Sequence, residues 1–349
     1  MNKKVLASAA TLAILLVCTL TMAGPPEGGY HLLKKIPLDA GAAGREYFDY
    51  ITFDAGTRRI YLSHGTEVLV VDADNWAVVG KVTGLKRCHG VALVPELGKG
   101  FITDGESATV DMFDLKTLKI TKEIKAADDA DSIVYDPASK HILSFNGDSR
   151  NSTVIDPQSG TVVKTLPLPG GPEFPVADGK GTVFVNGEEK NEVMVIDSHA
   201  LTVRAQWPVA PAGGPTAMAM DRQHRRLFSA GRKPAALVVM NADNGKVIQS
   251  FPISAGVDAA VFEPESGLVF CSTREGMIHI FHEDTPDKYS VVATIKTELG
   301  AKTMALDPKT HNLLVDTVDF GPPPAPTAQY PHPNPAAVPG TFHLLVYGR

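Results

Sequence analysis

The chain has 349 residues, of which 44% are hydrophobic, 21% charged and 7% aromatic, and this globular composition excludes a disordered polymer. Glycine (31) and proline (26) are abundant and the apolar runs are short and β-branched, which excludes an all-helical bundle and favours strands and turns. The net charge of −6 disfavours nucleic acid as a partner, because phosphate binding needs a basic surface.

Residues 1–23 are predicted to be a secretory signal peptide. A basic start precedes an uncharged apolar run, Val5–Met22, and the sequence up to Ala23 fits a small-x-small cleavage site. Cleavage would release a mature chain of residues 24–349 into the periplasm or the medium, and no membrane partner is expected after it. Two alternatives stay open: an uncleaved anchor, since the run just reaches the roughly 18 residues needed to span a bilayer, and a lipoprotein anchor at Cys18.

The mature chain repeats one motif seven times. Each unit has an apolar first strand that ends at an anchor residue, followed by a turn and by a second, third and fourth strand. The anchors recur every 40 to 44 residues and are Asp54, Val94, Asp136, Asp178, Asp221, Glu263 and Asp307. This spacing predicts an all-β, single-domain, seven-bladed β-propeller with one four-stranded blade per repeat.

The seventh unit lacks a fourth strand, because 341–347 forms its third strand and the chain ends at Arg349. Residues 31–38 (HLLKKIPL) resemble the fourth strand of the third unit, 161–168 (TVVKTLPL). We therefore expect the N-terminal strand to pair in the last blade and close the ring, which leaves no unpaired inner edge.

Two segments contain a family-like pattern of strand, asparagine, strand and Val-Ile-Asp. Residues 183–186 (VFVN) precede 193–197 (VMVID), and the ending recurs at 153–156 (TVID). In these repeats the mature chain resembles the YVTN-type β-propellers, which include the YncE-like periplasmic proteins, although the Tyr-Val-Thr-Asn tetrad itself is nowhere intact. The resemblance implies an extracytoplasmic propeller and no particular reaction. There is no Trp-Asp dipeptide, which disfavours a WD40 protein.

Polar residues stand at the start of the first strands, five positions before each anchor. We call this set the channel-mouth ring, and its members are Asp49, His89, Asp131, Glu173, Thr216, Asp258 and Lys302. The ends of the second strands lie at the same end of an up-and-down blade and add His64, Asp104, Asn146, Asn186, Arg232 and Arg274. Convergent polar groups at a concave opening predict a ligand site.

A solvated ring without a specific ligand is the first interpretation. A divalent metal site is the second: His64 and His89 are expected to approach each other beside Asp49 and Asp131, and imidazole with carboxylate suits zinc or another first-row ion. Four ring carboxylates should repel one another, and Lys302 offsets only part of that charge. We therefore expect raised proton affinity or recruitment of a cation.

An enzyme is the third interpretation. Glu173, His89 or Asp131 would be the catalytic residue of a lactonase or related hydrolase, and Arg232 or Arg274 would hold an anionic substrate; this rests on analogy of fold. We favour a binding scaffold for a protein, peptide or small ligand. The expected ligand-binding residues are Asp49, His64, His89, Asp131, Glu173, Arg232, Asp258, Arg274 and Lys302.

A proline-rich insertion, residues 321–340, follows the second strand of the seventh unit and should lie at the face of the channel-mouth ring. It is a lid, a docking strip or a solvated loop. Three histidines, His141, His224 and His311, lie beside the turns of the opposite face and are expected to be solvated. The two cysteines of the mature chain, Cys88 and Cys271, are expected to be free thiols, since they lie far apart in the repeat order.

Overall fold

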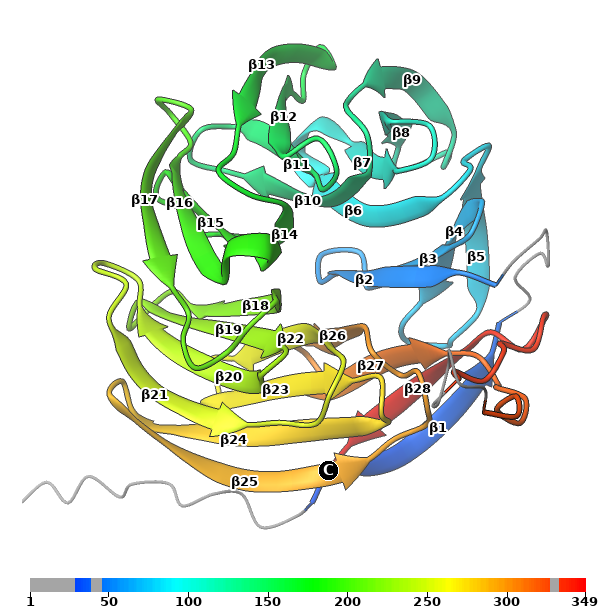
Figure 1. Cartoon of the computed structure of the whole chain (residues 1–349). Coiled ribbons are helices and arrows are strands. Elements are labelled where there is room, and N and C mark those ends of the chain that lie inside the picture. Colours follow the sequence, from blue (N-terminus) through cyan, green and yellow to red (C-terminus); the bar gives the residue numbers. More distant parts are fainter. Residues whose placement is uncertain (1–28, 39–45, 327–332) are drawn as a thin grey trace, which may run out of the picture.

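A computed structural model describes residues 29–38, 46–326 and 333–349. Its strands form seven four-stranded antiparallel sheets arranged as blades around a central channel (Figure 1). This confirms the predicted seven-bladed β-propeller. The proposed signal peptide lies outside the described residues. No helix in the described part of the chain is long and apolar enough to cross a membrane.

Each blade runs from an inner strand at the channel to an outer strand at the rim. The inner strands are β2 (Phe48–Asp54), β6 (Cys88–Val94), β10 (Ala130–Asp136), β14 (Pro172–Ala177), β18 (Pro215–Asp221), β22 (Val257–Glu263) and β26 (Met304–Asp307). The second strands are β3 (Arg59–His64), β7 (Lys99–Asp104), β11 (His141–Asn146), β15 (Thr182–Gly187), β19 (Arg226–Arg232), β23 (Leu268–Thr273) and β27 (Asn312–Thr317).

The third strands are β4 (Glu67–Asp72), β8 (Thr109–Asp114), β12 (Asn151–Asp156), β16 (Glu192–Asp197), β20 (Ala235–Asn241), β24 (Met277–Thr285) and β28 (His343–Gly348). The outer strands are β5 (Val78–Thr83), β9 (Ile120–Lys125), β13 (Thr161–Pro167), β17 (Thr202–Pro208), β21 (Val247–Pro252), β25 (Lys288–Lys296) and β1 (His31–Pro37). Two short 3-10 helices, η1 (Pro95–Leu97) and η2 (Glu188–Lys190), follow β6 and β15.

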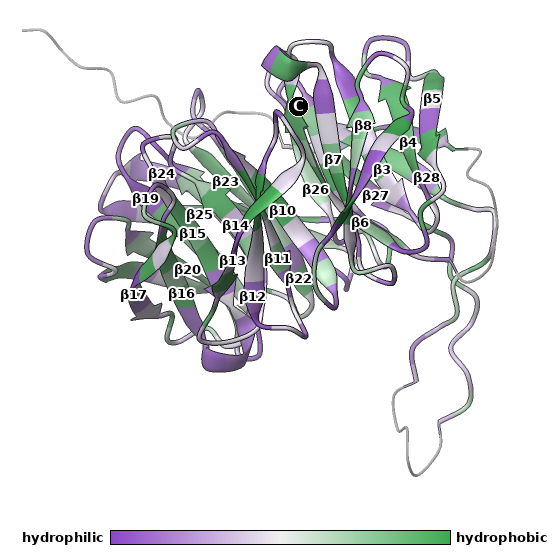
Figure 2. Cartoon of the chain, turned by 90° about the horizontal axis from the view of Figure 1, so that it is seen from above, coloured by the Kyte–Doolittle hydropathy of each residue, from purple (hydrophilic) through white to green (hydrophobic). Residues whose placement is uncertain are grey.

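The hydrophobic core lies between neighbouring blades. One cluster of buried apolar residues occupies each blade-to-blade interface, because the second and third strands are covered on both faces. Strand β4, for example, is buried from Glu67 to Val71, whereas outer strands such as β13 alternate between exposed and buried residues near their ends. Figure 2 shows apolar residues gathered in the strands and hydrophilic residues in the loops. A strand buried on both faces reads as a continuous apolar run, which is why the repeats were visible in the sequence.

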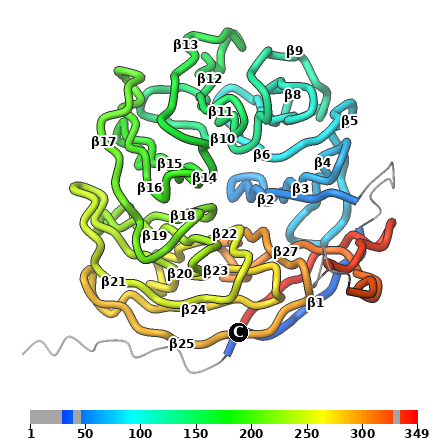
Figure 3. Tube along the Cα trace, in the orientation of Figure 1, coloured from blue at the N-terminus to red at the C-terminus, as the bar shows by residue number. Residues whose placement is uncertain are grey.

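The ring closes as predicted. Strand β1 pairs antiparallel with β28, with Ile36 opposite Leu344 and Pro37 opposite His343, and the sheet order is β1-β28-β27-β26. The backbone N–H of Leu38 extends the pairing by donating to the carbonyl of Phe342 at 2.9 Å. Figure 3 shows β1, in blue, beside the red C-terminal strand β28 in this blade.

Ion pairs between blades involve the anchor residues. A basic residue four positions after one anchor reaches the acidic anchor of the preceding blade in three places: Arg58 to Asp307, Arg225 to Asp178 and His311 to Glu263. The first of these pairs is bidentate, with distances of 2.9 and 2.7 Å, and it joins the first blade to the seventh. The anchors therefore connect neighbouring blades as well as ending the inner strands.

Cys88 and Cys271 are buried free thiols, as predicted. Burial raises the pKa of both Cys88 and Cys271 to about 12. Neither thiol is available as a thiolate nucleophile at neutral pH, because the thiolate is the reactive form.

Candidate functional site

The channel-mouth ring forms at the start of the inner strands because pairing with the second strand is irregular there. In the first three blades the register shifts between Phe48 and Ile51, between Cys88 and Val91, and between Ala130 and Ile133. Asp49, His89 and Asp131 lie inside these irregular stretches. A bulged residue leaves the regular ladder, so its side chain can turn toward the channel.

All seven ring residues line one cavity of about 220 Å³ at the channel mouth. Arg232 and Arg274 line it too, as predicted from the second-strand ends. The prediction missed four further lining residues: Tyr47, Tyr50, Arg87 and Asp129. Three of these stand two positions before a ring residue, and residues two apart in an extended chain face the same side, so strand periodicity could have found them.

The acidic side of the cavity is formed by Asp49, His89, Asp131 and Tyr47. His89 Nδ1 lies 2.8 Å from Asp49 Oδ2, 2.8 Å from Asp131 Oδ1 and 2.8 Å from the Tyr47 hydroxyl. That hydroxyl donates to Asp49 Oδ2 at 2.7 Å. Burial alone would lower the pKa of His89, but its hydrogen bonds to the two aspartates raise it to about 9.

The basic side is formed around Asp258, which Lys302 and Arg232 contact directly and which Arg274 approaches at 3.7 Å. Lys302 also lies 3.4 Å from Asp49 Oδ1 and so connects the two sides. Burial opposes ionisation of Asp49 and Asp258, but the Lys302 ammonium holds the pKa of both carboxyls below its usual range. The expectation of raised proton affinity is wrong for these two residues, because His89 and Tyr47 also lower the pKa of Asp49, and Arg232 and Arg274 also lower the pKa of Asp258.

Glu173 behaves as expected for a crowded carboxylate. Burial raises its pKa well above the usual value, and the charges of Asp131 and Glu188 raise it further. Arg232 opposes this shift without cancelling it. A carboxyl group with a raised proton affinity therefore borders the cavity.

His64 does not join His89, which corrects the predicted pair of imidazoles. Its Nε2 lies 2.6 Å from Glu46 Oε2, and its ring packs against Phe342 with centroids 4.4 Å apart. In the described part of the chain, the group of possible metal ligands at this mouth consists of Asp49, His89 and Asp131. His64 therefore contacts Glu46 and Phe342 and does not line the channel-mouth cavity.

The other predicted second-strand ends have structural roles. Asp104 accepts the backbone N–H groups of Lys86 and Arg87 at 2.8 and 2.9 Å and so fixes the segment that leads into His89. Asn146 donates to Asn151 at 2.7 Å, and Asn186 donates to the carbonyl of Ala217 at 3.0 Å. None of the three is among the residues that line the channel-mouth cavity.

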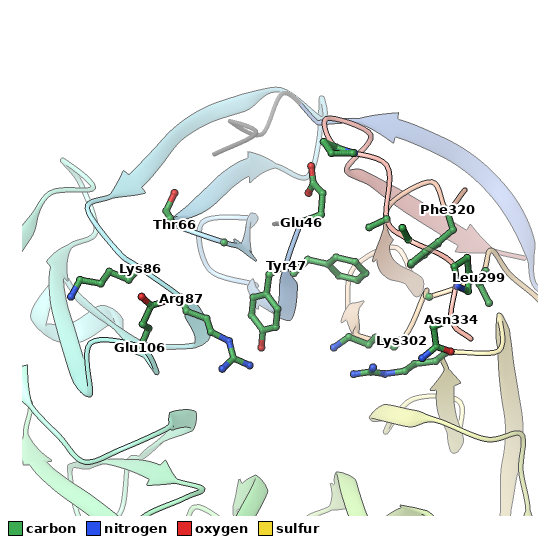
Figure 4. A pocket seen from close by; sticks show the side chains of 18 residues that line it. Glu46, Tyr47, Thr66, Lys86, Arg87, Glu106, Leu299, Lys302, Phe320 and Asn334 are labelled. Atoms are coloured by element: carbon green, nitrogen blue, oxygen red, sulfur yellow. The ribbon is translucent and has the colours of Figure 1, made fainter. Parts of the chain in front are cut away.

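A second cavity of about 1220 Å³ adjoins the first at the same face (Figure 4). The two share the lining residues Tyr47, Arg87, Arg274 and Lys302. Its outer wall is the proline-rich insertion, which lines it with residues 334–337 and 339, next to Phe320. In Figure 4 the side chains of Tyr47, Arg87 and Lys302, which precede the inner strands β2, β6 and β26, point toward the channel.

The described parts of the insertion are hydrogen-bonded to the propeller and to each other. Gly321 N–H donates to the Ala336 carbonyl at 2.9 Å, and Gly340 N–H donates to Glu46 Oε1 at 2.6 Å. Residues 327–332 of the insertion lie outside the described residues. Most described residues of the insertion are exposed, as a solvated loop would be, and residues 334–337 and 339 also line the cavity.

Two of the three histidines of the opposite face, His224 and His311, pair with acidic residues while their side chains stay 41% and 39% exposed. His311 Nδ1 lies 2.6 Å from Glu263, and His224 Nδ1 lies 2.7 Å from Asp221 and 2.8 Å from Glu283. His141 Nδ1 is buried and has no hydrogen-bond partner among the described residues. The contacts of His311 with Glu263 and of His224 with Glu283 each join two neighbouring blades.

Comparison with known proteins gives a fold and no family. No family model matches the chain, and no curated protein matches its sequence. A solved structure titled "Kuenenia stuttgartiensis Hydrazine Synthase" aligns with a TM-score of 0.68 and 17% sequence identity, covering 76% of this chain and 91% of that one. The likeness is one of fold. At this identity it supports the propeller architecture alone, so function has to be argued from the site.

Proposed function

We propose that the protein is an extracytoplasmic binding propeller that takes a small ligand with an anionic group at the channel mouth. The observation that supports this most is the convergence of all seven ring residues on one cavity that adjoins a larger one. A volume of about 1220 Å³ suits a small molecule or a short peptide, whereas a folded protein would need a broad outer surface.

The anionic character of the ligand follows from the cations that border both cavities. Arg87, Arg274 and Lys302 line the two cavities together, and Lys86 lines the larger one. The Arg274 side chain is 57% exposed, and its ion-pair contact with Asp258 is long at 3.7 Å, so its guanidinium can bind a new partner. Guanidinium groups bind carboxylates and phosphates by paired, charge-assisted hydrogen bonds.

A thermal-shift screen with small carboxylates, phosphates and short peptides tests this role, followed by calorimetry on each compound that stabilises the protein. Arg274→Ala should weaken binding by roughly tenfold or more, because a hydrogen bond to a charged group is lost. Arg150→Ala is the matched control, since Arg150 pairs with Glu189 at 2.9 Å on the exposed surface. Equal losses for both variants, or no binding by any compound, would contradict the proposal.

A hydrolytic enzyme of lactonase type is the second candidate, and Glu173 is the observation in its favour. A carboxyl group with a strongly raised pKa can donate a proton to a leaving group, which is the task of a general acid. Turnover of lactones by the purified protein, lost on Glu173→Gln with the fold intact, would support it. Saturable binding without turnover supports the first candidate.

The proposal also covers the cellular location of the protein and its relationship to other propellers. Residues 1–23 would direct export, and the repeat pattern supports kinship with the YncE-like propellers. N-terminal sequencing of the exported protein should begin at Gly24. A mature protein that retains residues 1–23 would instead support the membrane-anchored alternative.

A further inference from the structure

Four potential ligand atoms meet at the acidic side of the channel-mouth cavity. They are Asp49 Oδ2, His89 Nδ1, Asp131 Oδ1 and the Tyr47 hydroxyl oxygen, which come from two blade junctions. The carboxylate and imidazole atoms all lie within 4.8 Å of one another, and His89 Nδ1 is 2.8 Å from each of the three oxygens. Atoms that share one metal ion with bond lengths near 2.1 Å lie about 3.0 to 3.4 Å apart, depending on the coordination geometry.

Hydrogen bonding cannot account for all of these contacts. An imidazole nitrogen has at most one hydrogen, so a single Nδ1–H of His89 has to be shared among three oxygen neighbours. The Tyr47 hydroxyl has one hydrogen too, and Asp49 Oδ2 accepts it at 2.7 Å. At most one of the three contacts of His89 Nδ1 can therefore be a full linear hydrogen bond, and the other two have no proton of their own.

The outer oxygens of the two carboxylates have partners of their own. Asp49 Oδ1 lies 3.4 Å from the Lys302 ammonium, and Asp131 Oδ2 accepts the Tyr50 hydroxyl at 3.4 Å. Each carboxylate is thus oriented by a neighbour on one oxygen and directs the other oxygen at the common point. Outer partners that orient ligands in this way are typical of metal sites.

The imidazole is held in place by its surroundings. His89 is 2% exposed and its ring packs edge-on against Tyr47 at 5.3 Å between centroids. A side chain at Gly105 would place a Cβ 2.7 Å from His89 Nε2, so glycine at this position leaves room for the ring. The ring therefore presents Nδ1 to the cavity in one orientation.

We propose that Tyr47, Asp49, His89 and Asp131 bind one first-row divalent cation such as Zn²⁺, whose open coordination positions face the channel-mouth cavity. One imidazole nitrogen among oxygen ligands suits zinc or manganese better than calcium, which takes oxygen ligands alone. The inference rests on the binding role proposed above and deepens it, because a bound cation would attract the anionic group of the ligand.

Two other groups of acidic residues and histidine differ from this one. Near β1, Glu298 and Asp319 surround His343, but the Lys35 ammonium already lies 3.0 and 3.4 Å from the two carboxylates. On the opposite face, His224 joins Asp221 and Glu283 but its side chain is 41% exposed. The second group provides a control of the same chemistry away from the channel.

The test measures zinc on the purified protein after treatment with a chelator and dialysis. Calorimetry with ZnCl₂, MnCl₂ and CaCl₂ should show one tight zinc site per chain, weaker manganese and no tight calcium. His89→Gln and Asp131→Asn should each weaken zinc by about 100-fold or more, and Tyr50→Phe by about tenfold. His224→Gln is the matched control and should leave the tight site unchanged.

Several outcomes overturn the inference. These are no tight zinc site in the wild-type protein, a tight site that survives both His89→Gln and Asp131→Asn, or a tight site lost with His224→Gln. Circular dichroism checks each fold, and if the two ligand variants fail to fold, an unchanged zinc affinity in Tyr50→Phe and Tyr47→Phe decides against it. If small anions bind although the protein has no zinc site, the cation inference fails and the proposed binding role stands. If zinc binds but no small ligand does, the binding role fails and the cation inference stands.

Discussion

The bidentate pair between Arg58 and Asp307 joins the first and seventh blades, and removing its charge should weaken the ring measurably. Burial opposes ionisation of Asp307, but the Arg58 guanidinium lowers the pKa of this carboxyl from 3.8 to about 2. A displacement of this size corresponds to about 2 kcal/mol of folding free energy at neutral pH. Asp307→Asn retains an oxygen that can accept the N–H of Lys309, so the substitution removes mainly the ion pair.

The pH dependence identifies the cause. A carboxyl whose pKa is lower in the folded protein stabilises it above the unfolded pKa and loses this effect as pH falls through the folded pKa. The wild-type advantage over Asp307→Asn should therefore be about 2 kcal/mol at pH 7 and about half of that at pH 3. In thermal melts at pH 7 the difference should be roughly 3 °C.

The assay is urea unfolding followed by circular dichroism at both pH values. Glu189→Gln is the control, since it breaks the exposed pair with Arg150 and should not change stability measurably. Equal destabilisation by Asp307→Asn at pH 7 and at pH 3 would refute the reasoning, as would no effect at pH 7.

Three further predictions concern the closing strand, a buried acid and the proline-rich insertion. Deleting residues 30–38 exposes the edge of β28, so the melting temperature should fall and light scattering should reveal aggregation; an unchanged melt would refute closure. Burial raises the pKa of Asp316 to about 8, so ionisation should destabilise the fold increasingly from about pH 4 to pH 8, and Asp316→Asn should be the more stable protein at pH 8 in urea unfolding. Deleting residues 322–339 removes the outer wall of the larger cavity and should weaken any small ligand in calorimetry while leaving circular dichroism unchanged.

Repeat spacing predicted the blades because each blade buries the same strands. Six of the seven anchors are the last residues of their inner strands, and Asp178 directly follows β14. The same spacing placed the seven ring residues at one cavity. The position of a residue within its repeat was enough to predict that it lines the channel mouth, since the inner strand of every unit begins there.

Repeat spacing could not predict which residues from other parts of the chain contact a given side chain. His64 occupies a repeat position at which Arg232 and Arg274 line the channel-mouth cavity in two other blades, yet Glu46 and Phe342 hold it aside. His311 was expected to be solvated because its turn is exposed, and it also pairs with Glu263 of the preceding blade. Contacts of this kind depend on which residue the neighbouring blade presents.

The order of apolar runs by itself determined a closed ring of seven blades and the polar residues at its mouth, because burial of both strand faces leaves a regular mark in the sequence. Only the tertiary structure determined the pKa values of the carboxyl groups at the channel mouth. Lys302 approaches both Asp49 and Asp258 from another blade, and the pKa values of both carboxyls fall as a result. Charge interactions depend on distances of a few ångströms between side chains, and those distances are set only when the blades pack.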